Sequence, residues 1–351
     1  MTNPVTNYAA TLTDRFGSGW NRFWFTPSDA LVLCVVRILT GLVAIYWHLS
    51  YTTDLVRWFG ANGLLTVETV DRLTGASADA LDALAVFHYA YRNLLQTPAQ
   101  LWTAHVLGLV VLALFTAGLL TRVTSVLSLI VVLSYIHRAP MITGQLEPVL
   151  AMMIFYLCLV PAGTYLSLDR LLARSRRAKS APREFDEPTL PAPSVAATVG
   201  ARLMQVHLAA LYLMMGLTKL GTETWWYGDA VWWLIARADS RLVDLTFLHT
   251  APFLINAWTH AIVLFELSFG ILIWNRLARP LLLTVAILMW GSLALLTGLV
   301  SYCVIMMVAN LAFVSPESLR SCWTWCLGFR GGQEAGSQEG SDRVDETTAA
   351  V

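Results

Sequence analysis

Charged residues are scarce in this chain. They make up 13% of its 351 residues, whereas 56% are hydrophobic, and the mean hydropathy is +0.60. Soluble domains carry about 25% charged residues, so this chain has too few charged side chains to cover a surface exposed to water. The shortage excludes an ordinary soluble globular protein, and the many long apolar stretches predict several membrane spans.

An excess of positive charge and a metal-binding cysteine pattern are also missing. The 23 basic residues balance 23 acidic ones, so there is no general bias towards nucleic acid. Five cysteines are present, and Cys34, Cys158 and Cys303 lie inside apolar stretches. Cys322 and Cys326 have helical spacing, but no further Cys or His lies nearby in sequence to complete a zinc site. We therefore expect reduced thiols and no metal centre.

Apolar segments alternate with short turns and longer loops along most of the chain. They cover about residues 30–50, 99–120, 124–136, 146–160, 199–220, 252–274, 280–299 and 301–314. Their length and low charge are typical of membrane helices. We predict an all-α, polytopic integral membrane bundle of about eight spans.

The regions outside these spans differ in composition. Residues 1–29 mix aromatic and basic side chains, which predicts an interfacial leader. Residues 51–97 predict extracytoplasmic amphipathic helices, and such an ordered loop is a good place for function. The charge- and proline-rich stretch 161–197 predicts a basic cytoplasmic linker. Residues 316–351, rich in Gly, Ser and acidic residues, predict a largely disordered cytoplasmic tail.

The distribution of basic residues predicts the topology. If eight spans begin from a cytoplasmic N-terminus, the linker and most other basic residues fall inside. The arginines that then fall outside are Arg57, Arg72, Arg92, Arg138, Arg237 and Arg241. This agrees with the positive-inside rule. We expect a plasma or inner membrane protein with both termini cytoplasmic, and with Glu147 and Lys219 on the extracytoplasmic face.

A polar stripe runs along the fifth span. It consists of Arg202, Gln205, Tyr212 and Lys219, whose offsets are close to whole helical turns. Ala209 and Gly216 fill the gaps and should allow close helix packing. Lys219 ends the stripe, and an aromatic cluster that includes Trp225 and Trp226 follows it. Lys219 is therefore either an interfacial anchor or a partly buried base.

Three other charged residues lie inside or at the ends of spans. Glu266 lies about halfway along the sixth span, where a carboxylate indicates a functional site. The alternative is a structural ion pair or a hydrogen bond between helices, with Arg37 or Arg202 as the partner. Arg37, in the first span, should face the bundle interior or snorkel to the interface. Glu147, in the first turn of the fourth span, complements the helix dipole or contributes to a site.

Several segments resemble one family. The run GLTKLGTETWWYGDAVWW is similar to the corresponding segment of vitamin K-dependent gamma-carboxylases and of their bacterial relatives, the HTTM (horizontally transferred transmembrane) domain proteins. RFWFTPSDALVLCVVRILTGLVAIYWHL resembles the opening span of the family, and THAIVLFELSFGILIWNRLARP and GLVSYCVI resemble later spans. The resemblance covers about residues 20–315 and implies one transmembrane domain, which we place at 30–315.

The resemblance implies a membrane domain that oxygenates a reduced quinone, vitamin K hydroquinone, and uses the resulting base to carboxylate glutamate. The catalytic lysine of the family corresponds to Lys219, and Ser301 corresponds to a serine in the quinone-lining segment. The carboxylases have histidines where this chain has Leu146 or Glu147 and about Met289. The sequence also ends soon after its last span, without a large soluble domain. We therefore expect a quinone or lipid-like substrate and not peptidyl glutamate.

Three functions remain open from the sequence. The first is an enzyme in which Lys219 is the base and Glu266 and Tyr212 support it. Its candidate substrate-binding residues are Arg202, Gln205, Glu147, Trp225, Trp226 and Ser301. The second is a non-catalytic accessory, maturation or binding protein, similar to the sporulation-delaying protein B type. A transporter ranks third, because coupled transport calls for several intramembrane acids or broken helices. The sequence identifies no protein partner.

Overall fold

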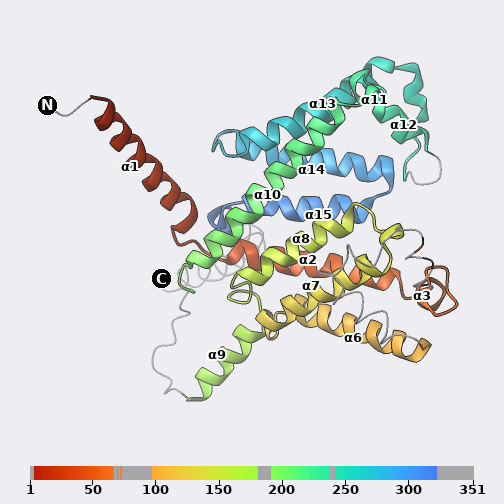
Figure 1. Cartoon of the computed structure of the whole chain (residues 1–351), viewed down its shortest axis with the longest axis horizontal. Coiled ribbons are helices and arrows are strands. Elements are labelled where there is room, and N and C mark those ends of the chain that lie inside the picture. The colour runs from red at the N-terminus through yellow and green to blue at the C-terminus, as the bar shows by residue number, and fades with distance from the viewer. Residues whose placement is uncertain are drawn as a thin grey trace, which may run out of the picture. The chain divides into compact units, whose positions relative to one another are not determined.

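The computed structural model describes residues 4–66, 69, 72, 97–180, 191–237 and 242–321. The chain divides into two compact units, 1–313 and 314–351, and the helices discussed below belong to the first. Within the described residues every regular element is a helix, apart from an isolated β-bridge between Ser28 and Ser194. The predicted all-α class is thus confirmed (Figure 1).

The helices closely follow the predicted apolar segments. In chain order they are α1 (Pro4–Phe25), α2 (Leu31–Ser50), α3 (Leu55–Phe59), α6 (Pro98–Ala117), α7 (Thr121–Arg138), α8 (Leu146–Leu159), α9 (Leu168–Ser180), α10 (Val195–Leu220), α11 (Glu223–Trp226), α12 (Ala230–Ala236), α13 (Pro252–Leu272), α14 (Ala278–Thr297) and α15 (Val300–Asn310). Single 3₁₀ turns cover Pro140–Ile142, Thr246–Thr250 and Leu311–Phe313.

Five of these helices, α2, α6, α10, α13 and α14, are long and apolar enough to cross a membrane. Helices α8 and α15 are apolar but shorter. Helix α7 has 18 residues and carries Arg122 in its first turn and His137 and Arg138 in its last. Helices long and apolar enough to span a membrane are therefore present as predicted, while the number of eight spans stays a prediction.

Local sequence sets the ends of the helices. At the start of α6, the Thr97 side chain accepts from the Gln100 backbone N–H, and the Gln100 side chain accepts from the Thr97 N–H. This capping box, with Pro98 in the first turn, satisfies backbone donors that a helix start leaves free. Helix α6 ends at Ala117 and is capped by Gly118, whose φ of 73° is in the left-handed region that favours glycine.

Helices α10 and α13 pack closely side by side (Figure 1). A Cβ added at Gly216 of α10 would lie 2.8 Å from Leu267 Cδ2, and one added at Gly270 of α13 would lie 3.0 Å from the carbonyl oxygen of Ala209. Small residues therefore let the two backbones approach, as the stripe on the fifth span predicts. This approach brings Lys219 of α10 within reach of α13.

Arg37 lies in the bundle interior and does not snorkel. Its side chain is fully buried. Its Nη1 donates to the carbonyl of Ala162 at 2.5 Å, and its Nη2 donates to the carbonyl of Leu166 at 2.6 Å. Both carbonyls belong to the turn between α8 and α9. The guanidinium thus ties α2 to this turn through two charge-assisted hydrogen bonds.

Helix α9 lies within the stretch 161–197, which the sequence predicts as a linker. Asp169, in its first turn, accepts hydrogen bonds from the backbone N–H of Leu120 at 2.9 Å and of Thr121 at 3.0 Å, and from the Thr121 hydroxyl at 2.9 Å. Burial by itself would raise the pKa of the Asp169 carboxyl, but these hydrogen bonds outweigh it and lower the pKa below its ordinary value. Asp169 therefore fixes α9 to the start of α7.

We expect Asp169→Asn to lower the free energy of unfolding by about 1–2 kcal/mol, because hydrogen bonds to an ionised acceptor are the stronger kind. Since the pKa is lowered in the folded state, the carboxylate stabilises above its unfolded-state pKa, and this contribution is lost as the pH falls through the folded-state pKa. Below pH 3.8, the ordinary pKa of an aspartate, the free energy of unfolding should thus change less with pH in Asp169→Asn than in the native chain. Asp54→Asn, at an exposed pair with Arg57, is the control, with an expected change within about 0.5 kcal/mol.

Some predicted regions lie largely outside the described residues. They include most of the predicted amphipathic helices in 51–97 and nearly all of the tail 316–351. The described start of the first region contains α3 and a turn at Gly60. The predicted leader 1–29 contains α1, on which Trp20 and Phe25 are exposed. Its interfacial placement stays a prediction.

Candidate functional site

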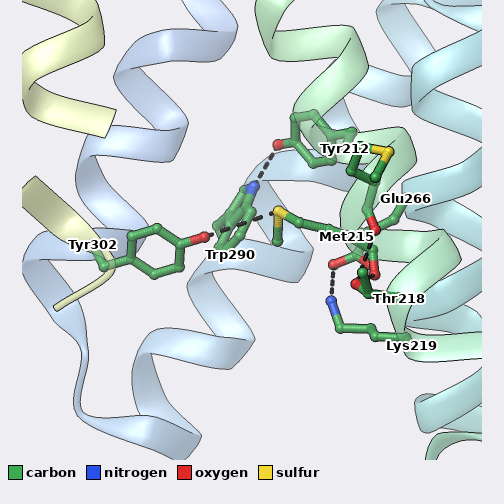
Figure 2. A network of polar contacts seen from close by, with 8 residues as sticks. Tyr212, Met215, Thr218, Lys219, Glu266, Trp290 and Tyr302 are labelled. Atoms are coloured by element: carbon green, nitrogen blue, oxygen red, sulfur yellow. Dashed lines mark hydrogen bonds and ion pairs between the residues drawn. The ribbon is translucent and has the colours of Figure 1, made fainter. Parts of the chain in front are cut away.

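Lys219 and Glu266 form an ion pair between α10 and α13. The Lys219 Nζ donates to Glu266 Oε1 (Figure 2). The same Nζ lies 4.9 Å from the centroid of the Trp225 ring, within the range of a cation–π contact. Arg37 and Arg202, the partners of Glu266 expected from the sequence, are therefore wrong. Arg37 is held by turn carbonyls instead, and Arg202 lies far along α10.

The two members of the pair differ in exposure. The Lys219 side chain is 18% exposed, whereas the Glu266 side chain is fully buried. Glu266 Oε2 has no hydrogen-bond partner in the described part of the chain. A buried carboxylate oxygen without a hydrogen-bond partner is costly, so Glu266 Oε2 lowers the stability of the folded chain. Lys219 is the member that a second molecule can reach.

Tyr212 belongs to a separate buried network. Its hydroxyl accepts from Trp290 Nε1 at 2.6 Å and from Asn310 Nδ2 at 2.9 Å, and it faces Asn310 Oδ1 at 3.2 Å. Figure 2 shows the Tyr212 hydroxyl turned towards Trp290 and away from Lys219. The observed contacts therefore assign Tyr212 to the tie between α10, α14 and α15.

We expect Tyr212→Phe to lower the free energy of unfolding by about 1–3 kcal/mol, because it leaves the buried Trp290 N–H and the Asn310 amide without their acceptor. Denaturation of the purified protein in micelles measures this change. Tyr227→Phe is the control, because the Tyr227 side chain is exposed and should lose little. Equal stability of the Tyr212→Phe variant and the native chain would contradict the assignment.

Arg202 and Gln205 lie at the other end of α10. Arg202 Nη1 donates to Gln205 Oε1 at 2.9 Å, and Gln205 Nε2 donates to the carbonyl of Ala312 at 2.6 Å. Arg202 Nε also donates to the carbonyl of Phe23. Seventeen residues of helix separate Arg202 from Lys219, about 25 Å at the rise of an α-helix. The structure therefore does not bring these two candidates to Lys219.

Glu147 and Ser301 line one cavity, with a volume of about 360 Å³. Glu147 Oε1 accepts from Trp47 Nε1 at 3.0 Å, and Oε2 accepts from the Gly144 backbone N–H at 2.8 Å. Tyr302 also lines the cavity, and its hydroxyl lies 4.0 Å from Met215 Sδ on α10, one turn before Lys219. Figure 2 shows Tyr302 on the side of Trp290 opposite the ion pair. Glu147 and Ser301 thus lie together at one cavity, and Tyr302 connects the lining of this cavity to α10.

The two tryptophans beside Lys219 differ. The Trp225 ring contacts the Lys219 ammonium, as described above, whereas the Trp226 side chain is 63% exposed. Both lie on the short helix α11, directly after α10. Trp225 belongs to the surroundings of the ion pair, and Trp226 is available to lipid or to another molecule.

A histidine cluster that was not expected from the sequence lies between α2 and α6. The His48 and His105 rings stack with centroids 4.2 Å apart. His105 Nδ1 lies 2.7 Å from the Tyr135 hydroxyl, and His48 Nε2 lies 2.9 Å from the carbonyl oxygen of His105. The available signal was a histidine near the end of each of two neighbouring apolar segments. Since these groups bind one another, they hold α2, α6 and α7 together.

No protein-family model, curated protein or solved structure matches this chain. The resemblance to the HTTM and carboxylase families therefore stays a prediction. The functional argument rests on the geometry of the Lys219–Glu266 pair and of the neighbouring cavity.

Proposed function

We propose that the chain is an eight-span membrane protein of the HTTM type that removes a proton from a reduced quinone or lipid-like substrate at the extracytoplasmic face, with Lys219 as the base. The observation that carries the proposal is a lysine ammonium joined to a fully buried carboxylate between two apolar helices. Intramembrane charges are costly and usually mark a functional site.

The contacts between helices support the span count. His48 of α2 meets His105 of α6, and Tyr135 of α7 meets His105, so these helices alternate in direction. Trp47 of α2 then contacts Glu147 at the start of α8. Shorter α8 and α15 continue the alternation, which supports eight passes with both termini on one side. The basic residues of the cytoplasmic loops predicted from the sequence support the proposal that this side is the cytoplasm.

The ion pair can hold its proton in two ways. Either Lys219 is an ammonium and Glu266 a carboxylate, or the proton sits on Glu266 and Lys219 is a neutral amine. Both forms have no net charge, so a poorly solvated site can exchange between them more easily than it could hold a single charge. The neutral amine of Lys219 is a base, and Lys219 is the exposed member.

The proposed step is a proton transfer. The O–H bond of the reduced quinone breaks, an N–H bond forms at Lys219 Nζ, and the electron pair stays on the quinol oxygen. The quinolate then gives two electrons and its remaining hydroxyl proton to dissolved dioxygen, which is the oxidant, and this forms the quinone and a hydroperoxide ion. The Lys219 ammonium returns its proton to the hydroperoxide, so hydrogen peroxide leaves and the amine is restored. Trp225 and Trp226 offer flat apolar surfaces for such a ring, and Ser301 and Glu147 offer polar contacts at the neighbouring cavity.

A non-catalytic binding or accessory function is the second candidate. The observation that favours it is that Lys219 already has two partners, Glu266 and the Trp225 ring. A lysine held in this way can serve as a tie between α10 and α13. Under this alternative Lys219→Met lowers the free energy of unfolding, as it does if Lys219 is a base, but the native chain shows no turnover.

Oxygen uptake by the reconstituted protein tests the proposal. We expect uptake that depends on added menaquinol or vitamin K hydroquinone, and a loss of at least about 100-fold in Lys219→Met, the usual scale for removing a general base. Lys179→Met replaces the other lysine of the sequence, on α9, and should keep full activity. Absence of uptake by the native chain, or equal uptake by both variants, would leave the binding function.

A further inference from the structure

The cavity beside Glu147 has an unusual lining. Besides Glu147 its walls include four aromatic side chains, Trp47, Tyr51, Trp58 and Tyr302. They come from the end of α2, from α3, and from the start of α15. The Trp47 and Tyr51 rings lie 5.4 Å apart at 90°. Two of the aromatic side chains that line the cavity are therefore set at a right angle to each other.

Glu147 supplies the charge of this cavity. Among the described residues that line it there is no lysine, arginine, histidine or aspartate. The Glu147 residue is 6% exposed. Its two oxygens each accept one hydrogen bond, from Trp47 and from Gly144. A carboxylate has about four acceptor sites, so these bonds fix its direction and leave room for another donor or cation.

Tyr51 stays a neutral phenol next to this charge. Burial, and then the negative charge of Glu147, raise the pKa of Tyr51 to about 12. The ring therefore keeps the electron-rich face that attracts a cation. Nothing in the lining repels positive charge, and every ionisable wall residue favours it.

We propose that this cavity binds an organic ammonium group, of the choline or ethanolamine type. Aromatic faces around a carboxylate recognise such cations by cation–π attraction and charge. A volume of about 360 Å³ is within the usual range for small-molecule sites. A bare metal ion is a poor fit, because Ca²⁺ and Mg²⁺ need about six oxygen ligands and the lining offers a single carboxylate. This binding does not depend on Lys219 acting as a base.

Choline and its neutral isostere 3,3-dimethylbutan-1-ol provide the test. The native chain is placed in nanodiscs of phosphatidylglycerol alone, so that no lipid carries an ammonium group, and binding is followed by titration calorimetry. We expect choline and tetramethylammonium to bind and the isostere to bind at least about tenfold more weakly, the scale of a desolvated cation–π and charge interaction.

Matched variants locate the binding. Glu147→Gln removes the charge and Trp58→Leu removes one half-buried wall, and each should weaken choline binding at least about tenfold. Glu223→Gln and Trp102→Leu make the same exchanges outside the cavity, at exposed positions on α11 and α6, and should not change it. Circular dichroism verifies that each variant is folded. If Glu147→Gln does not fold, Trp58→Leu carries the test.

A second arm identifies the source of the ammonium group. Native mass spectrometry counts phosphatidylcholine and phosphatidylethanolamine that stay bound to the chain. Retained lipid that is displaced by choline and lost in Trp58→Leu supports a lipid headgroup. Choline binding without retained lipid supports a free amine. If neither choline, tetramethylammonium nor these lipids bind, or if binding is equal for the neutral isostere or unchanged in both cavity variants, the proposal is overturned.

Discussion

Lys219→Met lowers the free energy of unfolding by about 3 kcal/mol, because it leaves the fully buried Glu266 without its cation. Loss of one member of a buried pair costs about 3–5 kcal/mol. We expect the lower part of this range, since Lys219 is 18% exposed and water can enter the space that it vacates. Denaturation in mixed micelles measures the change, and Lys179→Met is the control.

The double variant Lys219→Met/Glu266→Gln separates the pair from its parts. Removing both charges takes away the uncompensated carboxylate, so most of the lost stability should return. If the two single changes simply add, the ion pair contributes nothing of its own, and the contact between α10 and α13 depends on packing at Gly216 and Gly270 alone.

Arg37→Met is the second large expected effect, a loss of about 4 kcal/mol. Methionine fits the apolar surroundings but leaves the buried carbonyl of Ala162 and the part-buried carbonyl of Leu166 without their charged donor. An unsatisfied buried group costs about 1–3 kcal/mol. The guanidinium also contacts Gly118, where an added Cβ would lie 2.7 Å from Nη1, so the surrounding turn is shaped around it.

A local measurement tests the same change. If Arg37 holds the turn before α9, trypsin should cleave the basic helix α9 faster in Arg37→Met under native conditions. Arg57→Met replaces an exposed arginine. It should leave the rate of α9 cleavage unchanged and the free energy of unfolding within about 0.5 kcal/mol of the native value. Unchanged cleavage of α9 in Arg37→Met would contradict this role.

The sequence was informative wherever a single helix determines the outcome. The length and low charge of the apolar stretches located the apolar helices to within a few residues, and the small residues Ala209 and Gly216 correctly indicated close packing. These features depend on the spacing of side chains along one helix. The charge- and proline-rich composition of 161–197 predicted a linker, although part of this stretch folds as α9.

Pairing between helices was harder to predict. The partner of Glu266 depends on which helix neighbours α13 and at what height, and neither follows from the period of one span. Lys219 lies at a span end in the sequence, so it was weighed as an anchor. Arg37 binds carbonyls, which carry no signal in the side-chain sequence. His48 and His105 meet because α2 and α6 pack together, and this packing does not follow from the sequence of either helix alone.

Oxygen uptake by Lys219→Met/Glu266→Gln with menaquinol is the most direct test of Lys219 as a base. This double variant should be folded and nearly as stable as the native chain, so a loss of activity cannot be attributed to unfolding. If Lys219 accepts the quinol proton, uptake falls at least about 100-fold while the protein stays folded. Uptake at the native rate in the folded double variant would contradict the central claim and leave the ion pair as a structural tie.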